Sequence, residues 1–172
     1  MRRRHSAKGV LIIPILLLMV GVDIAQISLA PWITWAGATP DFMLATTVVL
    51  ALVFGPWAGG MWGIGTGTLA DVLAAHHVGL LAFPLMIIGY IAGLAHHRVL
   101  ESRIVIPAGI GAMATVGYLI LQGGVAILLG YPVIWRSLFG ETFWQRVIYT
   151  TVWTWIIFQG VIWLRSHQRR EV

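Results

Sequence analysis

The sequence predicts an all-α membrane protein: a bundle of about six transmembrane helices in a single integral membrane domain spanning residues 1–172. Of these residues, 59% are hydrophobic and only 10% are charged, whereas a soluble domain carries about 25% charged residues. Lys and Arg stand in short clusters between the apolar runs. This arrangement suits contact with anionic lipid head groups. It argues against nucleic-acid binding, which gathers basic residues on one face.

Six apolar runs, separated by charged or Pro/Gly-containing breaks, are the expected helices. In chain order they cover residues 10–30, 42–54, 57–75, 78–95, 104–129 and 147–164, with short tails at 1–9 and 165–172. The first run follows three arginines and could resemble a cleavable signal peptide. Its length exceeds the usual apolar core of about 7–15 residues in such signals. We therefore expect it to remain as a helix.

The second run is short for a transmembrane helix. Its 13 residues give about 20 Å of helix at roughly 1.5 Å per residue. Either the helix extends back through Asp41 and Pro40, or residues 42–75 form a re-entrant hairpin with the Gly55-Pro56 turn buried in protein. We expect a full crossing.

Basic residues set the expected orientation, because they are enriched in short cytoplasmic loops. With six crossings and a cytoplasmic N-terminus, the C-terminus is also cytoplasmic. The outer side then receives only Arg136 and Arg146 of the 11 Lys and Arg residues. Several tryptophans fall near the expected boundaries, as in interfacial aromatic belts. In the longest outer loop, 130–146, Trp135, Phe139 and Trp144 either rest at the lipid boundary or anchor a periplasmic partner.

Glycines recur every four residues in the third run, at Gly55, Gly59, Gly63 and Gly67, and the next position in that series is Asp71. Each glycine inside a helix costs about 1 kcal/mol relative to alanine, on scales measured in water. Small residues at this spacing let two helix backbones approach closely in a membrane. The ridge therefore packs either against the protein's own helices or against a partner helix.

Asp71 and Asp23 are the carboxylates that fall within expected spans. A charged Asp at the centre of a spanning helix costs about 2.5 to 3.5 kcal/mol on insertion scales, so such residues usually face protein or water. For Asp71 we consider three partners: His76 and His77, the N-terminus of the next helix, or solvent at the interface. Asp23 and Gln26 share a helical face and should bond to a neighbouring helix.

The sequence contains no recognisable catalytic, cofactor or metal motif. No nucleotide-binding loop, nucleophile motif or catalytic carboxylate pair is recognisable at its usual spacing. The pairs His76-His77 and His96-His97 fall on opposite sides of the membrane in this map, so a shared metal site is not expected. A channel or proton-coupled transporter would need a row of ionisable groups that the chain lacks. We therefore expect a non-enzymatic protein without a cofactor.

Residues 40–95 resemble the MreD family of bacterial rod shape-determining proteins. The resemblance lies in Pro40-Asp41 before a short apolar helix, the Gly-Pro-x-x-Gly and glycine-rich segment that ends in Leu69-Ala70-Asp71, then Gly79-Leu80 and Gly89-Tyr90-Ile91-Ala92-Gly93. The positions that match the family pattern are Pro40, Asp41, Gly59, Gly63, Asp71, Gly79 and Tyr90. Outside this window only size, hydropathy and arginine-capped ends agree.

This resemblance implies an inner-membrane subunit of the cell-wall elongation (rod shape) complex, required for cell shape. The implied partners are an MreC-like bitopic protein and, through it, the MreB filament and the glycan polymerase and transpeptidase pair of peptidoglycan synthesis. On this hypothesis, Gly63→Leu should weaken association with the MreC-like protein without preventing membrane insertion.

A similar fold is implied for the substrate-binding S components of energy-coupling-factor transporters. A vitamin-binding subunit is therefore the alternative function. Those subunits typically show Ala-x-x-x-Ala on their first helix, whereas Ala25 and Ala30 are five residues apart here.

Overall fold

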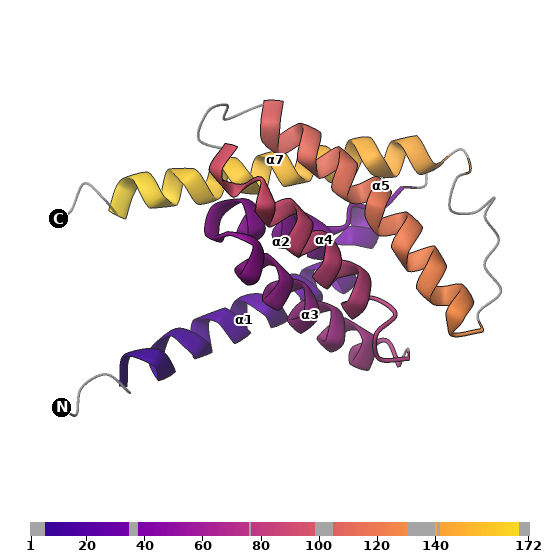
Figure 1. The fold of residues 1–172 in the computed structure, drawn as a ribbon, viewed down its shortest axis with the longest axis horizontal. Helices are drawn as coiled ribbons and strands as arrows, with labels where there is room; N and C mark the ends of the chain where they lie inside the picture. The colour runs from indigo at the N-terminus through magenta and orange to yellow at the C-terminus, as the bar shows by residue number, and fades with distance from the viewer. Residues whose placement is uncertain are drawn as a thin grey trace.

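Six α-helices form most of the described chain in this computed structural model, which confirms the all-α prediction for that part. The structure describes residues 6–34, 38–75, 77–98, 105–130, 140 and 142–168. The helices are α1 (Ser6–Ser28), α2 (Phe42–Phe54), α3 (Pro56–Leu73), α4 (Ala82–Leu94), α5 (Val105–Leu128) and α7 (Thr142–Gln168), with short 3-10 helices η1 (Ala30–Ile33) and η2 (His96–Arg98) (Figure 1).

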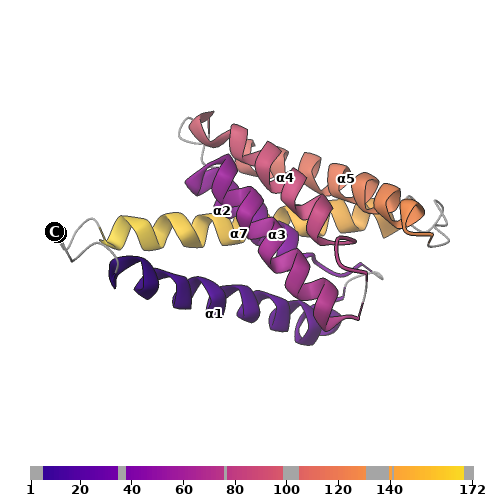
Figure 2. The same ribbon diagram turned by 60° about the horizontal axis from the view of Figure 1, so that its bottom comes forward.

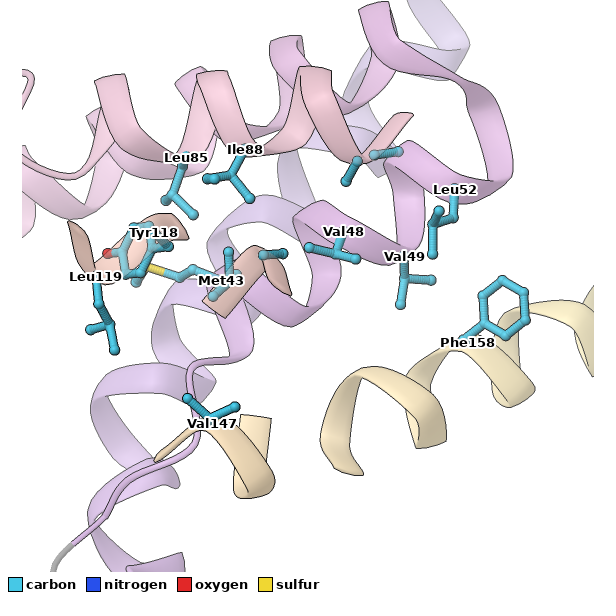
Figure 3. Close-up of a cluster of buried hydrophobic side chains, with 14 of the residues drawn as sticks. Met43, Val48, Val49, Leu52, Leu85, Ile88, Tyr118, Leu119, Val147 and Phe158 are labelled. Carbon is cyan, nitrogen blue, oxygen red and sulfur yellow. The ribbon is translucent and has the colours of Figure 1, made fainter. Parts of the chain in front are cut away.

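Helix α2 lies at the centre of the fold and contacts each of the other five helices. Ten of its 13 residues are buried. Figure 3 shows Met43, Val48 and Leu52 of α2 among side chains from α4, α5 and α7. A helix that is apolar on all sides belongs inside a protein. Because α2 is surrounded by protein, its short length does not have to match the thickness of a bilayer.

Four helix boundaries differ from the prediction by four residues or more. Helix α1 begins at Ser6 instead of residue 10, and helix α7 ends at Gln168 instead of residue 164, so the helices extend into the predicted tails. Helix α4 begins at Ala82 instead of residue 78, because Gly79 has a positive φ of 110° that ends helical geometry. Helix α7 begins at Thr142 instead of residue 147. Arg146 was expected in an outer loop, and that placement is wrong: it lies in the second turn of α7.

One helical segment among the described residues, Ile106–Leu128, is long and apolar enough by itself to cross a membrane. Shorter apolar helices cover Leu17–Ser28, Phe42–Phe54 and Ala82–Leu94. The first turn of α1 and the last turn of α7 lie at the same end of the molecule (Figures 1 and 2).

Some predicted features lie outside the described residues. They include His76, the arginines at positions 2–4, and most of the loop 130–146 with its Trp135, Arg136 and Phe139.

Candidate functional site

The glycine ridge of α3, made of Gly59, Gly63 and Gly67, packs directly against α4. Figure 2 shows the two helices lying side by side. A Cβ added at Gly59 would overlap the carbonyl oxygen of Gly89. One added at Gly63 would overlap the backbone of Leu85. One at Gly67 would overlap the backbone of Ala82. The contacts run in opposite directions along the two helices, which makes α3 and α4 an antiparallel pair. This surface is therefore occupied within the chain.

Gly55 differs from the other glycines of the series, because its backbone lies against Gly93 of α4 but its own Cβ position is open. It joins α2 to α3 with a positive φ of 96°, and a Cβ there would meet no atom within 4 Å. Its requirement for glycine is conformational, since other residues seldom adopt that φ. Gly79 is the corresponding turn glycine between α3 and α4.

Asp71 is fully buried and caps the next helix. Its Oδ2 accepts a hydrogen bond from the Gly79 N–H at 2.8 Å, and its Oδ1 accepts one from the Leu81 N–H at 3.0 Å. The Ala82 N–H also points to Oδ2, at 3.3 Å. Helix α4 has no capping side chain of its own, because Leu81 stands at its N-cap. Asp71 therefore satisfies backbone donors that the start of every helix leaves free.

Pro40 and Asp41 tie the start of α2 to α1 and α7. The Pro40 carbonyl accepts a hydrogen bond from Gln26 Nε2 at 3.1 Å. Asp41 caps α2 through a 2.9 Å bond from the Leu44 N–H, and its own N–H donates to Thr150 Oγ1 at 3.4 Å. Burial raises the pKa of the Asp41 carboxyl, and the Leu44 N–H and the charge of Arg146 oppose that shift.

Tyr90 lies apart from these contacts, on the outer surface of the α3/α4 pair. Its ring meets that of Trp57 edge to face, with centroids 5.8 Å apart. Both rings line a groove of about 480 Å³ whose walls are almost entirely apolar. The groove is lined by Trp57, Gly60, Met61, Ile64, Met86, Ile87, Tyr90 and Ile91. We call it the α3/α4 groove.

Among the remaining polar residues, Gln26 has the partner expected of it and Asp23 does not. Besides its bond to Pro40, Gln26 accepts a hydrogen bond from the Phe42 N–H at 2.7 Å. Asp23 is fully buried, and neither carboxyl oxygen meets a hydrogen-bond partner in the described part of the chain. His96 Nδ1 lies 2.6 Å from the Leu52 carbonyl oxygen. No group of three or more potential metal ligands occurs within the described residues.

Three glycines important to these surfaces were not expected from the sequence to pack helices: Gly60, and Gly89 and Gly93, which were noted only as part of the motif shared with the MreD family. Gly89 and Gly93 meet Gly59 and Pro56 of α3, backbone against backbone. Their four-residue spacing on α4 was the available signal, since it mirrors that of the α3 ridge. Gly60 could not be found this way, because it lies on a different face of α3 and lines the α3/α4 groove.

Searches of protein-family models, curated proteins and solved structures found no match to the chain.

Proposed function

We propose that this chain is a non-enzymatic, multi-pass subunit of the bacterial cell-wall elongation complex, and that the α3/α4 groove receives the transmembrane helix of an MreC-like bitopic partner. The chain resides in the inner membrane with both termini in the cytoplasm. The groove is the observation that carries the proposal. The resemblance of residues 40–95 to the MreD family names the complex.

The distribution of side chains supports a membrane location. Large apolar residues are exposed along the helices, as with Leu17 on α1, Met113 on α5 and Ile148 on α7. Buried positions instead include polar residues such as Asp71 and Thr66. Soluble domains seldom expose so many large apolar side chains together, and they seldom bury a carboxylate completely. The shared end of α1 and α7 in Figure 1 fits two termini on one side of the membrane.

The shape and chemistry of the groove favour a helix as its occupant. Gly60 lines the groove but is itself buried, and a Cβ added there would make ordinary contacts of 3.7 Å with the Met86 carbonyl oxygen and Tyr90 Cβ. The absence of a side chain at Gly60 leaves the groove deeper at this point, and small residues of this kind are common at interfaces between membrane helices. Two methionines, Met61 and Met86, supply flexible side chains that adapt to a partner surface.

The experiment compares Gly60→Leu with Gly124→Leu. A leucine at Gly60 extends into the α3/α4 groove, whereas a Cβ at Gly124 on α5 meets no atom within 4 Å. We expect Gly60→Leu to insert into the membrane but to lose co-purification of the MreC-like partner and to leave depleted cells round. Gly124→Leu should restore both partner binding and rod shape.

Gly63→Leu, the substitution suggested by the sequence alone, is unsuitable for this purpose. It would push into the Leu85 backbone and disturb the fold itself. Full partner binding and normal rods with a correctly inserted Gly60→Leu variant would contradict the proposal.

The vitamin-transporter alternative receives less support from the same structure. A transporter subunit of that type needs a small-residue surface on its first helix for its coupling protein. Ala30 lies beyond the end of α1, in η1, and is buried within the chain. Ala25 and Ala30, which already depart from the Ala-x-x-x-Ala pattern, therefore do not form a common exposed surface.

A further inference from the structure

A second cavity, of about 220 Å³, shares no lining residue with the α3/α4 groove. It is formed by the start of α2, the middle of α5 and the first turns of α7, with contributions from Gln26 and Leu81. Its walls are about equally polar and apolar, whereas those of the groove are almost entirely apolar. The side chains that give it this character are Asp41, Thr115, Tyr118, Gln122, Arg146 and Thr150.

Some polar groups of this cavity already form hydrogen bonds within the chain, and others do not. The Gln26 amide is committed to Pro40 and Phe42, and the Thr115 hydroxyl donates to the Gly111 carbonyl at 2.8 Å. By contrast, Arg146 Nε is buried without a hydrogen-bond partner in the described part of the chain. A buried donor left without a partner costs about 1–3 kcal/mol, so native proteins rarely keep one without a reason.

Two further groups are available to form hydrogen bonds with a ligand. No hydrogen bond joins the Tyr118 hydroxyl or the Gln122 amide to another residue within the described ranges, although Tyr118 as a whole is buried. Figure 3 shows Tyr118 close to Met43, at the edge of the apolar cluster. The unpartnered Arg146 Nε, the Tyr118 hydroxyl and the Gln122 amide thus line one cavity, in which Arg146 also interacts with the opposite charge of Asp41.

We propose that this cavity binds a small anionic ligand, a phosphate or carboxylate that also carries hydroxyl or amine groups. The guanidinium of Arg146 offers paired donors whose geometry matches either anion. The Asp41 carboxylate accepts from the ligand's hydroxyl or amine groups. The cavity is smaller than the roughly 300–1,000 Å³ of pockets for drug-sized molecules, so it suits a compact ligand or one head group.

The segments that form the cavity share one end of the molecule in the orientation proposed above. The end of α1, the starts of α2, α4 and α7, and the second half of α5 all face the outer side. The ligand therefore enters from outside the cytoplasm, either as a free solute or as the head group of a lipid in the outer leaflet. This site lies on other elements than the α3/α4 groove, so the two proposals can fail separately.

The test measures binding to the purified full-length chain. The soluble probes are radiolabelled glycerol 3-phosphate and glutamate, in detergent micelles. The lipid probe is phosphatidylglycerol, counted by native mass spectrometry after reconstitution, with phosphatidylcholine for comparison.

Arg146→Gln should weaken binding at least about tenfold, because a hydrogen bond to a charged group is lost. Tyr118→Phe should weaken it about threefold, as loss of a neutral hydrogen bond does. Arg98→Gln, in η2 at the far end of α4, is the matched control and should bind as the unmodified chain does.

The outcomes separate the two sources of the ligand. Saturable binding of a soluble probe that Arg146→Gln loses identifies a free solute. Retention of phosphatidylglycerol alone, lost in the same variant, identifies a head group. The proposal is overturned if none of the three probes binds saturably, or if a monodisperse Arg146→Gln variant binds as well as the control. Should that variant not fold, unchanged affinity in Tyr118→Phe overturns it.

Discussion

At the scale of single residues, the fold depends on the glycines of α3 and on the carboxylate of Asp71. Gly59, Gly63 and Gly67 allow the backbones of α3 and α4 to touch, and Asp71 bonds the N–H groups at the start of α4. The spacing of the glycines and their alignment with Asp71 were visible in the sequence. The location of their contacts was not, because a four-residue ridge has the same pattern whether it faces its own chain or a partner.

Gly63→Ala should destabilise the protein by about 1–3 kcal/mol, the usual range for an overpacked contact. The added methyl group would overlap the Leu85 backbone, which cannot move aside as a side chain can. Unfolding in a graded series of sodium dodecyl sulfate measures the change, with Gly124→Ala as the control. Equal stability of the two variants would show that α3 and α4 do not approach as closely as the structure has them.

Asp71→Ala should cost about 1–3 kcal/mol, because it leaves buried backbone donors at Gly79 and Leu81 without an acceptor. Asp71→Asn keeps one acceptor oxygen and should lose less. The same unfolding assay ranks the variants. If alanine is tolerated as well as asparagine, Asp71 does not cap α4.

At the scale of helices, apolar runs predicted which elements exist better than they predicted where each begins. The run 42–54 matches α2 residue for residue, since charged or turn-forming residues flank it on both sides. Helix α4 begins four residues later than expected because Asp71 and Gly79 create a capped turn inside an apolar stretch. Helix α7 begins five residues earlier, because Arg146 was taken for a loop residue.

Single cysteines can test whether α2 and α3 each cross the membrane. The chain has no cysteine of its own, and Phe54 and Val78 are exposed near the two ends of α3. A membrane-impermeant maleimide should label Phe54→Cys only from the cytoplasmic side and Val78→Cys only from the outer side. Thr34→Cys, between α1 and α2, serves as a second outer control. Protection of Phe54→Cys from both sides would instead favour a re-entrant hairpin.

At the scale of the whole molecule, the two hollows arise from how the helices assemble. The polar cavity joins residues as distant in sequence as Gln26 and Arg146, and no local pattern connects them. The α3/α4 groove is formed by side chains from both helices, other than the glycines through which the two backbones touch. Composition and periodicity predicted an all-α protein and a glycine ridge suited to close helix packing. They could not predict surfaces that exist only once distant helices meet.

Site-specific photo-crosslinking in native membranes tests most directly whether the α3/α4 groove holds a partner helix. Met61 lines the groove and is 71% exposed, whereas Met113 on α5 is 77% exposed and lies outside it. A benzophenone side chain at position 61 should crosslink to the MreC-like protein, and one at position 113 should not. Crosslinks from position 113 alone, or equally from both positions, would contradict a docking site between α3 and α4.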